Sequence, residues 1–261
     1  KWRGKGRVEG GVDGVDERAS RLILPYLKPD YLVVTNLFRD SLKRNAHPDY
    51  IFSVINTYCP DTTKLILNAD ELCSSMLKPN NERVFFGIGK QPEDLTQSIN
   101  IVSDYSLCPK CGTPLEYDYL RYHHIGHAHC PACDFHSQDA QFLATNVDTK
   151  NMVLTMNVRG EQVDFPLISD ILFNIYNEVT VITTLLEVGI PVHQVQALVA
   201  KIQVPDSRLN QVSAGGVTVV QAMSKGQSCI SSCRTFDYVS SQPWKKAIIL
   251  SMDDAYDRKQ S

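Results

Sequence analysis

Two CxxC pairs, Cys108-Pro-Lys-Cys111 and Cys130-Pro-Ala-Cys133, constrain the fold of this chain more than any other feature. Two residues between cysteines let a tight turn direct both sulfurs at one ion, and two such turns complete a tetrahedron of ligands. The stretch 112–129 between the pairs has the length typical of a four-thiolate zinc site. A disulfide pair or a redox motif is the alternative, but a redox motif needs a single CxxC at the start of a helix. The pattern therefore predicts one zinc ion held by all four cysteines.

A site closed by four thiolates has no open coordination position, so it indicates a structural module rather than a catalytic metal. Residues 104–138 are accordingly predicted to form a zinc ribbon inserted into a larger domain. With four thiolates available, the histidines of this segment are predicted to be surface residues: His123, His124, His127 and His129. Three tyrosines are expected to form the small apolar face of the ribbon: Tyr117, Tyr119 and Tyr122.

The chain of 261 residues is long enough for one large or two modest domains, and its 43% hydrophobic content supports a real core. Its net charge of -3 gives no sign of a polyanion-binding surface. Between Cys108 and Cys133 the two basic residues, Lys110 and Arg121, are balanced by two acidic ones. A zinc-ribbon protein that binds nucleic acid is therefore a disfavoured alternative. The other four cysteines are scattered, and no apolar run reaches the length of a membrane span, which favours the cytoplasm.

Short apolar runs alternate with helical patterns along the chain, which is typical of a parallel α/β sheet. The predicted strands are 31–35, 64–67 and 83–87, and the predicted helices are 19–27, 49–58, 174–188 and 192–202. A β-hairpin is expected at 152–159 and 162–165 around Gly160, and strand-like runs follow at 217–222 and 245–251.

Polar residues follow two of these strands, at the sheet edge where open α/β sheets bind ligands. The sequence after the first strand is TNLFRD (35–40), and the sequence after the second is NADE (68–71). Each is an ordinary turn or cap on its own, but two on adjacent strand ends favour a shared polar site. The segment FNIYN (173–177) opens a predicted helix, where exposed N–H groups suit a nucleotide, although Asn174 alone is more often a helix cap.

The order TNLFRD, LNAD, CPxC…CPxC and NIYN resembles the Mur-ligase-like family, and within it the MurT-like synthetase subunits, over residues 16–257. The resemblance implies a Mur-ligase-like central parallel-sheet ATPase domain over 1–203, an inserted zinc ribbon over 104–138, and the incomplete start of a smaller α/β C-terminal domain over 204–261. It implies a bacterial ligase that uses ATP and magnesium to activate the D-glutamate carboxylate of the lipid II stem peptide as an acyl phosphate. Ammonia from a GatD-like glutaminase partner then gives D-isoglutamine. A peripheral contact with the membrane-bound peptidoglycan precursor follows from the same resemblance.

The resemblance also implies roles for individual residues. Those expected near the nucleotide are Asn36, Arg39, Asp40, Asn68, Asp70, Asn174 and Asn177. Arg208 is expected to face the phosphates, and Lys225 matches a lysine on the next strand. Asp257 is the nearest match to an aspartate that completes the partner glutaminase's catalytic site.

Several positions depart from the family pattern. The phosphate-loop motif GxxxxGK[ST] is missing from these residues, and Gly14 stands where the family has a magnesium-binding glutamate. Lys43 replaces an acidic residue, and Asn210 replaces a glutamate. These 261 residues, interpreted as an incomplete chain, are therefore expected not to hydrolyse ATP by themselves. A catalytically decayed or substrate-altered scaffold that binds a partner is the second interpretation.

Overall fold

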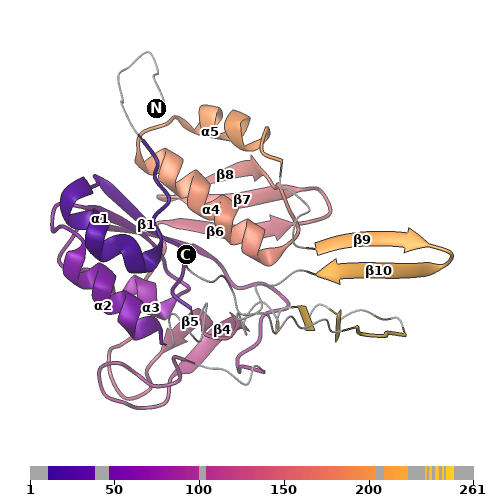
Figure 1. Ribbon diagram of the computed structural model, residues 1–261, viewed down its shortest axis with the longest axis horizontal. Helices are drawn as coiled ribbons and strands as arrows, with labels where there is room; N and C mark the ends of the chain where they lie inside the picture. Colours follow the sequence, from indigo (N-terminus) through magenta and orange to yellow (C-terminus); the bar gives the residue numbers. More distant parts are fainter. Residues whose placement is uncertain are drawn as a thin grey trace, which may run out of the picture.

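The computed structural model describes residues 11–38, 47–99, 104–203 and 209–222, together with single positions and short pieces between 233 and 249. Its centre is a six-stranded sheet in the order β1-β2-β3-β6-β7-β8 (Figure 1). The strands span Tyr31–Val34 (β1), Lys64–Asn68 (β2), Arg83–Ile88 (β3), Phe142–Asp148 (β6), Val153–Val158 (β7) and Glu161–Pro166 (β8). The first four are parallel, whereas β7 runs antiparallel to its two neighbours, β6 and β8. The predicted parallel α/β sheet is thus confirmed for β1, β2, β3 and β6, within a sheet that is mixed overall.

Helices cover both faces of the sheet. One face packs against α1 (Ser20–Leu27), α2 (Pro48–Tyr58) and α3 (Leu72–Ser75), and the other against α4 (Leu172–Glu187) and α5 (Val192–Val199). A 3-10 turn, η1 (Glu17–Ala19), precedes α1. Alternation along β2 explains the two layers, since Leu65 and Leu67 join the cluster of α1 and α2 while Ile66 joins that of α4. None of the helices in the described ranges has the length and apolar character needed to cross a membrane.

The predicted hairpin around Gly160 is confirmed, because β7 and β8 pair in register from Val158 with Glu161. Arg159 and Gly160, which join them, have φ values of 53° and 103°. Two residues with positive φ form the tight turn whose twist matches that of the strands, and glycine adopts this conformation without strain.

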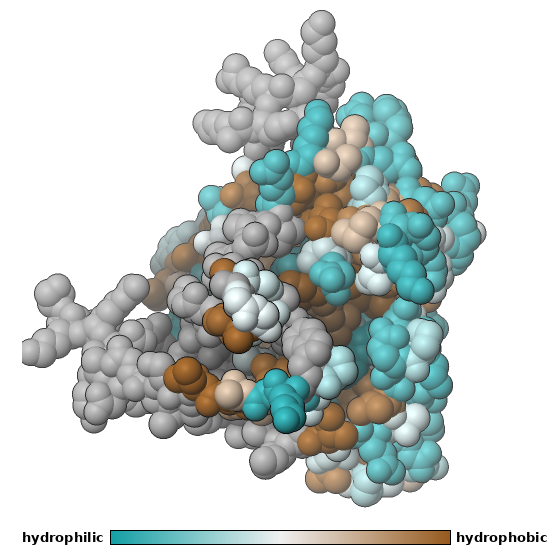
Figure 2. Space-filling model, turned by 90° about the vertical axis from the view of Figure 1, so that its right-hand side faces the viewer, coloured by the Kyte–Doolittle hydropathy of each residue, from teal (hydrophilic) through white to brown (hydrophobic). Residues whose placement is uncertain are grey.

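Outside the ribbon, two of the described strands were not predicted, and one predicted strand is wrong. The sequence did not indicate β6, nor β9 (Leu209–Ala214), which pairs antiparallel with the predicted run at β10 (Val217–Ala222). The β9–β10 hairpin projects away from the six-stranded sheet (Figure 1). Figure 2 faces the side from which it projects and shows apolar residues at the surface. Within the hairpin, Val212, Val217 and Val219 are exposed. Within 245–251, the described residues 245–249 form no strand, and Ile248 and Ile249 are 58% and 96% exposed. Without a neighbouring strand among the described residues, a β-like pattern does not form a strand.

The ribbon is an excursion between two neighbouring strands of the sheet. It leaves after β3 and returns at β6, which pairs directly with β3. Its core is a hairpin of β4 (Glu116–Tyr122) and β5 (Ile125–His129). Bridges from Leu95 to Leu120 and from Glu71 to Ile125 dock this hairpin against the carboxyl end of β2 and the loop after β3.

Glu178, a residue of α4, has a buried acidic side chain. The residue is 1% exposed, its Oε2 accepts a hydrogen bond from the Ile168 N–H at 3.0 Å, and its Oε1 has no partner among the described residues. Burial raises the pKa of Glu178 from 4.5 to about 7. Its carboxyl group is therefore protonated in the folded protein at pH values where the unfolded chain has already ionised it.

Raising the pH from 4.5 towards 7 should accordingly destabilise the fold through this one group. The Glu178→Gln variant should be more stable than the unmodified protein at pH 8 by on the order of 2–3 kcal/mol, and nearly equal to it at pH 4.5. Urea unfolding at both pH values measures the difference. The control is Glu161→Gln, because Glu161 is exposed. Equal gains at both pH values would contradict the raised pKa.

Candidate functional site

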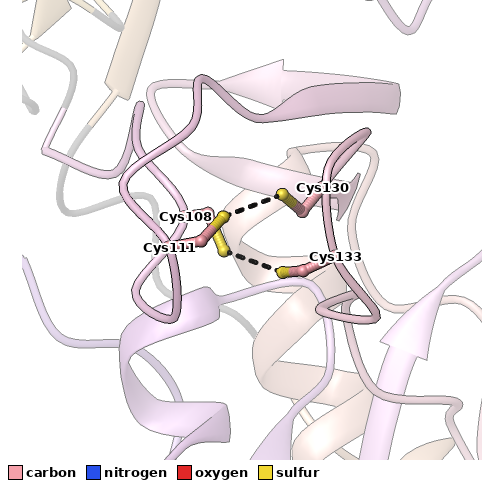
Figure 3. A group of neighbouring side chains, drawn as sticks. All are labelled: Cys108, Cys111, Cys130 and Cys133. Carbon is pink, nitrogen blue, oxygen red and sulfur yellow. Dashed lines mark hydrogen bonds between the residues drawn. The ribbon is translucent and has the colours of Figure 1, made fainter.

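The four cysteines lie together at the open end of the β4–β5 hairpin, with their sulfurs facing one another (Figure 3). Cys108 Sγ lies 3.6 Å from Cys133 Sγ, and Cys111 Sγ lies 3.5 Å from Cys130 Sγ. All four sulfurs are within 4.8 Å of one another. Thiolates about 2.3 Å from a tetrahedral zinc ion stand roughly 3.8 Å apart. The spacing therefore fits zinc, and the four thiols are free rather than paired as disulfides.

Each CxxC pair lies in a tight turn whose backbone directs the sulfurs inward. Gly112, with a φ of 74°, donates its N–H to the Cys108 carbonyl at 2.9 Å and closes the first turn. The N–H groups of Lys110 and Ala132 each donate to the first sulfur of their own pair, at 3.4 Å. These N–H groups hold the two sulfurs in place, and the thiolate is the form of cysteine that binds metal.

The prediction that the ribbon histidines are surface residues is wrong for two of the four. His123 and His124 are 2% and 1% exposed. They form the turn of the β4–β5 hairpin, and this turn packs against Phe38 in the loop after β1. His127 and His129 are partly exposed, and both contact Asp118, at 2.9 and 3.2 Å.

Arg121 is the centre of a buried polar network that joins the ribbon to the sheet. Its side chain is 2% exposed, and its Nη1 donates to Asp70 Oδ2 at 2.9 Å and to the Tyr176 hydroxyl at 2.6 Å. Its Nη2 donates to two backbone carbonyls at the end of β3 and to the Asp94 carboxylate. Burial alone would lower the pKa of Arg121, but the surrounding groups, Tyr176, Asp70 and Asp94, raise it. The guanidinium therefore stays charged and connects three segments.

Asp70, predicted to lie near a nucleotide, is 1% exposed and surrounded by donors from the chain itself. It accepts hydrogen bonds from the Ile88 N–H at 2.9 Å, the Tyr119 hydroxyl at 3.0 Å and the Tyr176 hydroxyl at 2.7 Å, besides Arg121. Burial raises the pKa of both tyrosines, so both hydroxyls stay protonated. The Tyr119 hydroxyl is thus part of this polar network, so the predicted apolar face of the ribbon is not purely apolar at this residue. A direct contact between Asp70 and a nucleotide stays a prediction.

Glu71 forms a second buried pair with the ribbon. It is fully buried, and its Oε1 lies 3.0 Å from His124 Nε2 and accepts the Cys73 N–H at 2.8 Å. Its Oε2 accepts the N–H groups of Leu37 at 3.1 Å and Ser74 at 2.7 Å. Burial would raise the pKa of Glu71, but the hydrogen bond and charge of His124, with the bonds from Ser74, lower it. Glu71 is therefore an anion that caps α3 and holds the loop after β1.

The ends of β1 and β2, both predicted to border a ligand site, adjoin one another. Asn68 is buried, and its Nδ2 donates to the Thr35 carbonyl at 3.1 Å. Asn36 is exposed directly beyond that contact. The two strand ends therefore form one continuous polar edge.

The N-terminal part of α4 lies at the same edge, because the Tyr176 hydroxyl donates a hydrogen bond to Asp70. Asn174 bonds a serine hydroxyl just before the helix at 3.1 Å, and Asn177 is exposed. The remaining predicted residues lie outside the described part of the chain: Arg39, Asp40, Arg208, Lys225 and Asp257.

Sequence reasoning missed the residues that hold this edge together, namely Arg121, Glu71 and His124. Two signals were available. Glu71 directly follows the predicted Asp70, and Arg121 stands between tyrosines in a segment with few charges.

A hollow of about 330 Å³ lies between this edge and the ribbon. It is bordered by Ala69 and Asp70 after β2, by Gly89 and Lys90 after β3, and by Asp118 of β4 among others. The carboxyl ends of β2 and β3 thus border an open space, and such an edge is where sheets of this kind bind ligands.

No family model matches the chain. Two similar proteins of known name are both MurT subunits. The chain is 33% identical over 178 residues to lipid II isoglutaminyl synthase (glutamine-hydrolyzing) subunit MurT of Staphylococcus aureus (strain COL), covering 67% of this chain and 39% of that protein. The MurT subunit of Streptococcus pneumoniae (strain R6) is 27% identical over 171 residues, covering 62% and 36%. The chain thus spans about two fifths of the length of these relatives.

Among solved structures, a pseudomurein peptide ligase type C from Methanothermus fervidus superposes with a TM-score of 0.55. The match covers 71% of this chain and 36% of that one, at 21% identity. At this level of identity the similarity is one of fold alone.

Proposed function

Because this chain is a MurT-like protein of the Mur ligase type, we propose that it belongs to the synthetase subunit of a lipid II isoglutaminyl synthase. The proposed substrate is the D-glutamate of the lipid II stem peptide. Its carboxylate oxygen takes the γ-phosphoryl group of ATP, which gives an acyl phosphate and ADP. Ammonia, released from glutamine by a GatD-like glutaminase partner, attacks the acyl carbon, and phosphate leaves. The product is D-isoglutamine.

The observation that carries this proposal is the meeting, at one sheet edge, of three segments that the sequence predicts to lie near a nucleotide. The Asn68–Thr35 hydrogen bond joins the ends of β2 and β1, and the Asp70–Tyr176 hydrogen bond joins them to α4. We propose that Mg-ATP lies along this edge, near Asn36, Arg39, Asp40, Asn68, Asp70, Asn174 and Asn177. Arg208 and Lys225 are proposed to face the phosphates, and Asp257 to complete the partner glutaminase's site.

The four-cysteine site is proposed to hold structural zinc. Four thiolates leave no position for a substrate, so the metal would supply folding energy rather than catalysis. The reaction is then proposed to take place at the sheet edge.

The proposed location is the bacterial cytoplasm, at the inner face of the membrane where a lipid-linked precursor is reached. A peripheral contact would suffice for this, because the reacting carboxylate is on the peptide rather than on the lipid.

Binding of Mg-ATP tests the proposal directly. The protein expressed from its complete gene should bind Mg-ATP in titration calorimetry, with and without the glutaminase partner. Asn177→Ala should weaken that binding about tenfold, as expected for one lost hydrogen bond, while Gln194→Ala on α5 should not. Residues 1–261 alone should show no ATP turnover, since the phosphate-loop motif is missing from them.

One result would contradict the ligase proposal. If the complete protein carried one zinc per chain but bound no Mg-ATP, it would instead be the partner-binding scaffold considered from the sequence.

A further inference from the structure

We propose that the zinc ribbon positions the loop after β1 through His124, which acts as a positioning residue for the nucleotide site. This inference rests on the proposed function, because the described part of that loop carries Asn36, one of the proposed nucleotide contacts. The ribbon would then help to position residues of the nucleotide site, in addition to being a separately folded insertion.

His124 occupies a closed position between the ribbon and the sheet. Its side chain is 1% exposed and its Nε2 lies 3.0 Å from Glu71 Oε1. Its ring centroid is 5.0 Å from that of Phe38 and 5.0 Å from that of Tyr105. Two aromatic rings and one carboxylate therefore fix the position of the imidazole.

Glu71 contacts both His124 and the backbone of the loop after β1. While Oε1 faces His124, Oε2 accepts the Leu37 N–H at 3.1 Å. Leu37 is 3% exposed and stands between Asn36 and Phe38. A single carboxylate thus connects the ribbon turn to the backbone of the loop.

The β4–β5 hairpin, whose turn carries His124, is held in a fixed position against the segment after β2. Gly126 donates its N–H to the Asp70 carbonyl at 2.8 Å, and a Cβ at Gly126 would stand 2.2 Å from the Tyr119 carbonyl oxygen. No side chain fits there, so the hairpin register cannot shift by one residue without a clash. The four cysteines lie at the opposite end of the same two strands, so a bound metal would restrain this register as well.

Core packing alone is the competing explanation of His124. A buried histidine that only fills space would lower stability when replaced, without a selective effect on the loop or on nucleotide affinity. Experiments that follow the loop itself distinguish the two roles.

The test compares His124→Leu, which cannot donate to Glu71, with His124→Gln, whose amide can. The control is His129→Leu, a partly exposed histidine of the same ribbon. Amide hydrogen exchange of Leu37 should accelerate in His124→Leu and return towards the unmodified rate in His124→Gln. In the protein expressed from its complete gene, His124→Leu should weaken Mg-ATP binding about tenfold, and His124→Gln should restore most of it, with zinc unchanged at one per chain.

The outcomes separate this inference from the proposed function. If the unmodified complete protein binds no Mg-ATP, the proposed function fails, and Leu37 exchange still tests the link from His124 to the loop. If Leu37 exchange and Mg-ATP affinity are the same in His124→Leu as in the unmodified protein, the inference is overturned. Equal losses in His124→Leu and His124→Gln would also overturn it, since they would show a role in packing alone.

Discussion

Replacing Cys108 with serine is expected to reduce the zinc content from one ion per chain to well below one, and to unfold the ribbon. Three thiolates and a hydroxyl hold zinc poorly, and modules of this kind lose their fold without metal, for which apparent binding free energies are about 10–16 kcal/mol. The ribbon also holds Asp70 and Glu71, so its loss should destabilise the sheet edge. The melting temperature should fall by about 10 °C or more, since each 1 kcal/mol corresponds to roughly 2–4 °C at this size.

Metal analysis and thermal unfolding of the purified variant measure both effects. Lys110→Ala is the matched control, because it lies inside the same CxxC pair, keeps all four thiolates and removes only an exposed ion pair with Asp134. Unchanged zinc content and melting temperature in Cys108→Ser would show that the four-thiolate interpretation is wrong.

The second large effect is expected at Arg121. Replacing it with methionine keeps much of the side-chain volume but leaves Asp70 and Asp94 buried without their cation. Removing one partner of a buried ion pair typically costs about 3–5 kcal/mol, so the free energy of unfolding should fall by that amount. Urea unfolding of the purified protein measures it.

Two further variants identify the cause. Arg21→Met removes an exposed arginine of α1 and should change the free energy of unfolding by no more than about 0.5 kcal/mol. Adding Asp70→Asn to Arg121→Met should cost less than the sum of the single changes, because the two residues share one interaction. Purely additive losses would contradict a coupled pair.

The four-cysteine cluster and most strands could be predicted from the sequence because their signals are local. A CxxC turn needs only four consecutive residues, and β2 needs only the apolar run that follows Lys64. The hairpin at Gly160 likewise depends on the residues of its own turn. These features do not depend on distant parts of the chain.

The buried polar network could not be predicted because its partners are far apart in sequence. His124 and Arg121 look like surface residues of a small ribbon until Glu71 and Asp70, about fifty residues earlier, are placed beside them. Burial of a charged group is decided by such partners rather than by the pattern around it. The same reason explains the wrong prediction at 245–251, where a β-like pattern has no neighbouring strand in the described part of the chain.

The position of the ribbon between β3 and β6 also has a consequence for how the chain folds. These two strands are neighbours, yet they can pair only after the whole intervening segment has been closed into a loop, which is entropically unfavourable. A metal that joins Cys108 and Cys111 to Cys130 and Cys133 would shorten that loop before the strands meet. Metal supply would then influence the rate at which the sheet is completed, and not only the stability of the finished protein.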